Sequence, residues 1–142
     1  MSYGYMRNAS ALYQQNSVRG SVEDADAHQL IGMLLDGAID RISQARGQME
    51  RGDVAGKGHS ISRAVAILGE LREGLDHKVD PAFSQRLESL YEYVTRRLLH
   101  AQLHDDPSAL DESVRLLSPL REAWQAIRGE YLASRQAAGG AR

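Results

Sequence analysis

The chain has 142 residues, 42% of them apolar and 25% charged, a composition typical of one folded domain and unlike that of disordered or fibrous proteins. Its 17 basic and 19 acidic side chains give a formal net charge of -2, which excludes broad attraction to nucleic acid. No cysteine is present, so disulfides and thiolate metal sites are excluded. No basic start leads into an apolar run, and nowhere do 18 apolar residues stand together, so we expect neither a secretory signal nor insertion into a membrane.

Residues 1–24 form a polar stretch without helical or strand periodicity, and we expect an irregular N-terminal segment there. After it, apolar residues recur at steps of three and four, the pattern of a helix that buries one face. A first helix is expected from about Ala27, because Asp26 followed by Gln29 resembles a capping box, to Gly52, which can adopt the left-handed conformation. The glycine-rich stretch 52–58 is interpreted as a loose loop rather than a phosphate-binding one, since no strand precedes it.

A second helical pattern follows that stretch, and two further helices have the same kind of start signal. The pairs Asp80-Pro81 and Asp106-Pro107 predict these starts, because proline fits the first helical position, where its missing N–H would be unbonded anyway. Pro119 should kink or split the fourth helix near residues 116–117. We expect the core to contain the stripe residues Ile31, Leu34, Leu35, Ala38, Ile42, Ala45, Met49, Ile61, Ala64, Val65, Leu68, Leu71, Leu75, Phe83, Leu87, Leu90, Tyr91, Val94, Leu98, Ala101, Leu110, Val114, Leu117, Leu120, Trp124, Ile127 and Tyr131.

Four amphipathic segments joined by short connections predict an all-α fold, an antiparallel up-down-up-down four-helix bundle. The expected organisation is an N-terminal segment at residues 1–24, a bundle at 25–133 and a flexible C-terminal tail at 134–142.

Histidines are the natural place to look for chemistry. His100 and His104 stand four residues apart, so both rings could face one metal ion beside Asp105 or Asp106. We favour a pair of exposed polar residues at a helix end, because no HExxH motif is present, and keep a histidine metal site as a minor alternative. No serine elbow or phosphate loop occurs either, so we expect no enzyme, no catalytic residue and no cofactor.

Several large apolar residues lie off the predicted stripes. If they align between helices, they form a groove for a partner's amphipathic helix, whereas residues scattered singly carry no such meaning. A self-associating structural bundle, in which they cover a homodimer interface, is a further alternative. These residues are Leu30, Met33, Tyr93, Leu99, Leu103, Leu116 and Leu132.

A series of short segments resembles the flagellin-specific export chaperones, the FliS family, from about residue 13 to residue 127. Their order and spacing together carry the resemblance, since each alone is only a piece of amphipathic helix. The segments are Tyr13 with Val18, HQLIGMLLDGA at 28–38, RGDVAGKG at 51–58, ILGELREGLD at 67–76, LESLYEYVTRRLLHA at 87–101 and LREAW at 120–124.

The resemblance implies a cytoplasmic chaperone that binds the disordered C-terminal segment of flagellin as helices laid along the bundle. Such a chaperone prevents premature polymerisation and delivers flagellin for flagellar type III export, with the export gate as a further partner. The N-terminal tyrosine segment would fold over the empty groove as a lid, and a segment packed permanently on the bundle is the alternative. The residues expected to bind flagellin are Tyr13, Val18, Leu30, Met33, Leu34, Asp36, Tyr93 and Leu99.

Overall fold

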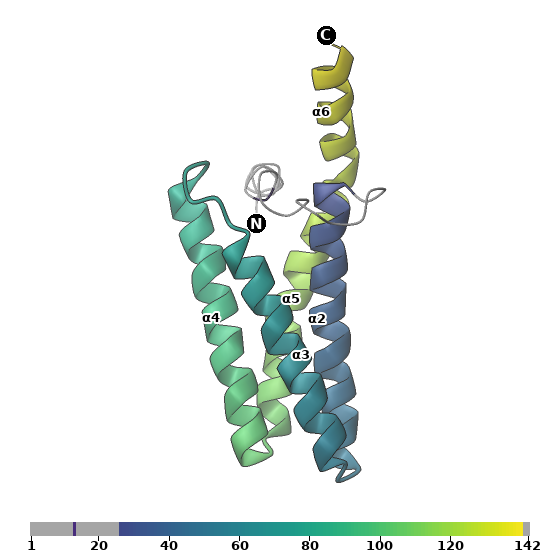
Figure 1. The fold of residues 1–142 in the computed structure, drawn as a ribbon, viewed down its shortest axis with the longest axis vertical. Helices are drawn as coiled ribbons and strands as arrows, with labels where there is room; N and C mark the ends of the chain where they lie inside the picture. Colours follow the sequence, from purple (N-terminus) through teal and green to yellow (C-terminus); the bar gives the residue numbers. More distant parts are fainter. Residues whose placement is uncertain (1–12, 14–25, 141–142) are drawn as a thin grey trace.

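The computed structural model describes Tyr13 and residues 26–140, and the rest of the expected N-terminal segment lies outside these residues. The helices in this part are α2 (Ala27–Glu50), α3 (Val54–Glu73), α4 (Pro81–His104), α5 (Pro107–Ala126) and α6 (Arg128–Gly140). Helices α2 to α5 run alternately in opposite directions, α2 packing on α3 and α5, and α4 also packing on α3 and α5 (Figure 1). The predicted all-α four-helix bundle is confirmed. Within the described part, no helix is both long and apolar enough to cross a membrane.

Aspartate side chains begin all four bundle helices. Each accepts a hydrogen bond from a backbone N–H two or three residues further on, which satisfies one of the donors left unpaired at a helix start. The donor–acceptor distances are 2.7 Å at Asp26, 3.0 Å at Asp53, 3.2 Å at Asp80 and 3.0 Å at Asp106. The predicted starts after Asp26, Asp80 and Asp106 are therefore confirmed, and Gly52 adopts the expected left-handed conformation with φ 72°.

The start of α3 corrects the loop expected at residues 52–58. The helix begins at Val54, and Asp53 caps it by accepting from the N–H of Gly56. A Cβ atom on Gly56 would lie 2.3 Å from the Asp53 carboxylate, so glycine leaves the space that this cap needs. The buried Lys57 then pairs with Asp105 at the end of α4, which holds the first turn of α3 against its neighbour.

Pro119 does not split α5 near residues 116–117, which was one of the two expected outcomes, a kink or a split. The helix continues through the proline to Ala126. Pro119 is exposed, while Leu117 and Leu120 beside it are buried. The ring therefore faces solvent, and apolar burial on the opposite face holds the turns before and after it on the bundle.

The break in the fourth helical stretch comes instead at Ile127, after which the chain continues as α6. This helix extends beyond the other four (Figure 1). The boundary expected between bundle and tail at residues 133 and 134 falls inside α6, which stays helical to Gly140. The stretch expected to be a tail from residue 134 therefore continues α6 as far as Gly140.

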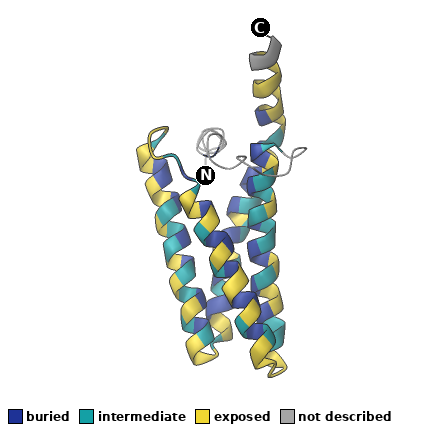
Figure 2. Ribbon diagram, viewed as in Figure 1, coloured by how far each residue is buried: buried dark blue, intermediate teal, exposed yellow. Residues whose placement is uncertain are grey.

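The core lies between the four bundle helices, where buried residues face inward and exposed ones outward (Figure 2). Most of the core residues named from the helical stripes are buried, which confirms the helix phases. Five other stripe residues are partly buried and pack against this core: Leu34, Met49, Val65, Leu90 and Val114.

Candidate partner-binding site

Tyr13 sits in the core, only 1% exposed, at the end of the bundle where α3 stops. Its hydroxyl lies 3.0 Å from the hydroxyl of Tyr91 in α4, and its ring meets Trp124 of α5 edge-on with centroids 5.8 Å apart. A Cβ atom on Gly74 would lie 3.1 Å from the Tyr13 ring, so α3 also approaches closely. We call the surroundings of the ring, formed by Tyr91, Trp124 and Gly74, the Tyr13 seat.

Both tyrosines of this pair are held neutral. Burial raises the pKa of Tyr91 to about 12, and burial together with the neighbouring Tyr91 raises the pKa of Tyr13 well above its ordinary value. Two neutral hydroxyls 3.0 Å apart form a hydrogen bond in which either is the donor. The seat therefore combines packing of the Tyr13 ring with a buried hydroxyl contact that phenylalanine could not make.

Trp124 also joins α5 to the start of α2. Its indole N–H donates to the backbone oxygen of His28 at 2.9 Å, and Nε2 of His28 donates to the backbone oxygen of Trp124 at 2.7 Å. The two rings stack with centroids 4.8 Å apart and planes 8° from parallel. Tyr131 of α6 packs on the same imidazole at 5.2 Å, so one buried histidine contacts both helices of the C-terminal half.

An ion pair next to this stack ties α6 to the N-terminus of α2. Arg128 donates to the two carboxylate oxygens of Asp26 at 2.9 and 3.2 Å, and its Nη1 lies 3.3 Å from Nδ1 of His28. The bond from Arg128 is the largest cause that lowers the pKa of Asp26. Asp26 therefore acts both as the cap of α2 and as the counter-charge of the first α6 residue.

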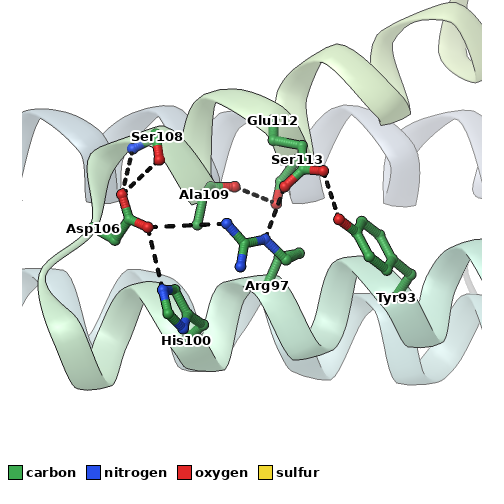
Figure 3. Close-up of polar contacts among 8 residues, drawn as sticks. All are labelled: Tyr93, Arg97, His100, Asp106, Ser108, Ala109, Glu112 and Ser113. Atoms are coloured by element: carbon green, nitrogen blue, oxygen red, sulfur yellow. Dashed lines mark hydrogen bonds and ion pairs between the residues drawn. The ribbon is translucent and has the colours of Figure 1, made fainter.

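A second polar cluster bridges α4 and α5, and it includes the predicted site residue Tyr93 (Figure 3). The Tyr93 hydroxyl donates to Glu112 at 2.6 Å, and Arg97 donates to the other oxygen of that carboxylate at 2.8 Å. These two bonds, that from Tyr93 first, lower the pKa of Glu112. His100 lies 3.2 Å from Asp106 in the same cluster. The exposed Tyr93 ring therefore lies beside several charged side chains of α4 and α5.

The two histidines considered for a metal site are neighbours. The rings of His100 and His104 are 4.6 Å apart and tilted by 46°. Nε2 of His100 is directed to Asp106 (Figure 3). Among the described residues, no group of three or more histidine, aspartate, glutamate or cysteine side chains is arranged to hold a metal ion.

The predicted partner-binding residues on α2 differ in exposure. Met33 is 55% exposed, Leu30 is half-buried, and Leu34 packs against the core. Asp36 lies 3.8 Å from Arg121 of α5, which places it on the α5 side of the helix. Leu30, Met33 and Leu34 stand at steps of three and four and so lie on one side of α2, but they differ in how far neighbouring helices cover them.

The predicted residues on α4 lie on opposite sides of that helix. Tyr93 is bonded to Glu112 of α5. Leu99, 53% exposed, follows Glu92 by seven residues, or two turns, and Glu92 lies 3.9 Å from Arg72 of α3. Since α2 lies diagonally across the bundle from α4, the predicted residues on these two helices lie on different parts of the described bundle. Val18 lies outside the described residues.

The sequence interpretation missed His28 and Arg128, which connect the seat to α6. The signal for His28 was present, because it precedes the buried Ile31 by three residues and Leu35 by seven and so lies on their stripe. Arg128 offered no comparable signal, since its partner Asp26 is 102 residues away along the chain.

Comparisons with known proteins agree with the resemblance noted in the sequence. A family model described as "Flagellar protein FliS" matches residues 7–131. The chain is 41% identical over 123 residues to flagellar secretion chaperone FliSB of Pseudomonas aeruginosa, which covers 87% of this chain and 98% of the relative. It is 41% identical over 124 residues to flagellar secretion chaperone FliS of Salmonella typhimurium, covering 87% and 92%, and 35% identical over 122 residues to that of Escherichia coli, covering 85% and 90%.

Proposed function

Because this chain belongs to the FliS family of flagellar secretion chaperones, we propose that it holds the C-terminal segment of flagellin in the cytoplasm and delivers it to the flagellar export gate. As a member of this family the chain is a chaperone and not an enzyme. Its action is binding: a segment that would otherwise polymerise is kept covered until export.

The match of residues 7–131 to the FliS family model is the observation that supports this function best, and the exposed apolar side chains indicate where a partner can be covered. Such side chains occur on all five described helices, at Met33 of α2, Val54 of α3, Leu99 and Leu103 of α4, Leu116 of α5 and Leu132 of α6. One short helix in one groove would cover only a few of them. A long, disordered segment that folds as it binds can cover several faces, and the apolar area it buries offsets the entropy of ordering it.

Tyr13 has a supporting role in this proposal. Its ring fills a place in the core beside Trp124, so removing it leaves a cavity at the end of the bundle. We therefore expect the N-terminal segment to brace the binding surface rather than only to cover it. A segment that merely competed with flagellin would lower the fraction of binding-ready chaperone, and its removal would tighten binding.

Titration calorimetry with flagellin, full length and lacking its C-terminal segment, tests the function. We expect binding of the first and none of the second. Met33→Ser and Leu99→Ser should each weaken binding by about 0.5–1.5 kcal/mol, additively, because they contact separate parts of one long segment. Val79→Ser, at an exposed position between α3 and α4, is the matched control and should leave affinity unchanged.

Two further measurements separate the alternatives. Deletion of residues 1–22 and Tyr13→Ala should both weaken flagellin binding, with circular dichroism confirming that the helices remain; tighter binding would favour a competing lid. Light scattering of the chaperone alone tests the self-associating alternative, which requires a dimer lost on Met33→Ser or Leu99→Ser. Equal affinity for both forms of flagellin would contradict the proposed function.

A further inference from the structure

The imidazole of His28 is held in one protonation state by its two neighbours. The backbone oxygen of Trp124, 2.7 Å from Nε2, can only accept, so Nε2 carries a hydrogen. The guanidinium of Arg128, 3.3 Å from Nδ1, can only donate, so Nδ1 must present its lone pair. Both contacts are satisfied together only when the ring is neutral.

A second proton on the ring has no favourable place. It would put an N–H on Nδ1 against the N–H groups of Arg128 and add a positive charge beside an existing one. Around the ring, α5 contributes the oxygen and indole of Trp124, and α6 contributes Arg128 and the Tyr131 ring, over which Arg135 lies at 5.9 Å. The nearby negative charge is Asp26 of the α2 cap, and both its oxygens already accept from Arg128.

We propose that His28 is a pH-sensitive switch: as a neutral ring it joins α2 to α5 and α6, and its protonation releases α6 from the bundle and loosens the seat of Tyr13. The link to the seat runs through Trp124, which stacks on His28 with one face and meets the Tyr13 ring at 5.8 Å. Repulsion between protonated His28 and Arg128 also strains the ion pair of Arg128 with Asp26, which fixes the start of α6. The switch is a property of the chain alone and does not depend on what the bundle binds.

The direction of the pH dependence follows from the buried ring. Burial lowers the pKa of His28 from its usual 6.5, and the Arg128 charge lowers it further, against the opposing effects of the Trp124 bond and Asp26. The released state therefore binds the proton more readily than the joined state. The contacts by which His28 joins α2 to α5 and α6 have their full strength above about pH 6.5. They weaken as the pH falls below that value, and weaken no further below the depressed pKa of His28.

The fluorescence of Trp124, the single tryptophan of the chain, and hydrogen exchange of α6 report on the switch directly. In the full-length protein between about pH 5 and pH 8, we expect an emission change with a midpoint below 6.5. Protection of the α6 amides, corrected for intrinsic exchange, should fall with it, by up to about tenfold per pH unit, the limit for one linked proton. His28→Gln, whose amide can donate to Trp124 and accept from Arg128 but does not titrate, should show neither change.

Two controls make the result decisive. His59→Gln, at an exposed histidine of α3, should keep both changes. Arg128→Gln removes the charge that faces Nδ1 and should shift the midpoint upward, toward 6.5. A wild-type signal that is flat over this range, a transition that persists in His28→Gln, or an unshifted midpoint in Arg128→Gln would each overturn the proposal.

Discussion

Trp124 illustrates what a helical stripe does and does not predict about a single residue. Its burial follows from the spacing of apolar residues in the fourth helical stretch, and it is 1% exposed. The contact partners of Trp124 could not be predicted in this way. The spacing of apolar residues identifies the buried face of one helix but not which side chain of another helix packs against it. The exchange of hydrogen bonds with His28, 96 residues away, required the packed structure.

The hydroxyl pair of Tyr13 and Tyr91 allows the polar part of the seat to be measured separately from its packing. Tyr13→Phe or Tyr91→Phe alone should cost about 1–3 kcal/mol, because the remaining buried hydroxyl loses its neighbour. The double variant should cost less than the sum of the two, with a coupling of about 1 kcal/mol. Denaturant unfolding followed by circular dichroism gives these values.

Tyr93→Phe is the matched control for that cycle. Its hydroxyl also donates to a partner, Glu112, but at an exposed position, where the lost bond is replaced by water (Figure 3). Its cost should be below about 0.5 kcal/mol. Additive effects of the two seat variants would show that the 3.0 Å contact contributes nothing to stability.

At the scale of helices, the starts were predictable and the interior of α5 was not. A start depends on a few adjacent residues, so an aspartate followed by proline was sufficient at Asp80 and Asp106. The proline in α5 and the glycines of α3 reduce local helix propensity, and packing overrides both. For α3 the deciding contact is Lys57 with Asp105, 48 residues away, which no local pattern contains.

The strain that Pro119 places on α5 should be measurable. Pro119→Ala restores the N–H that can donate to the backbone oxygen of Arg115, and alanine is favoured by about 3 kcal/mol in a helix interior. Part of this gain is offset by the greater freedom of the unfolded chain, about 0.4–1 kcal/mol, so we expect a net stabilisation of about 2–2.6 kcal/mol. Thermal unfolding by circular dichroism provides the test, and an unchanged or lower melting temperature would mean that the turn has adapted to the proline.

For the whole molecule, the alternating order of four helices was predictable because short connections force neighbouring helices to be antiparallel. The contact between the start of α2 and the start of α6 was not predictable. The start of α2 and the start of α6 lie side by side (Figure 1), joined by Asp26 and Arg128. Of the residues expected to bind a partner, Met33, Tyr93 and Leu99 are exposed, and where they lie on the surface depends on how the helices are rotated in the bundle.

Variants of Asp26 separate its role as the cap of α2 from its ion pair with Arg128. Asp26→Asn keeps a side-chain oxygen for the N–H of Gln29 but loses the charge that faces Arg128, so its cost at neutral pH should be at most about 1 kcal/mol. Asp26→Ala loses both and should cost about 1–3 kcal/mol.

Because Arg128 lowers the pKa of Asp26 from 3.8, the unfolded chain binds the proton first as the pH falls. The advantage of the wild type over Asp26→Asn should therefore be complete above about pH 4 and disappear as the pH falls through the depressed pKa. Urea unfolding at neutral pH and at about pH 3 compares the two proteins in both regimes, and a difference that persists undiminished in acid would show that the carboxylate contributes through its shape and not through its charge.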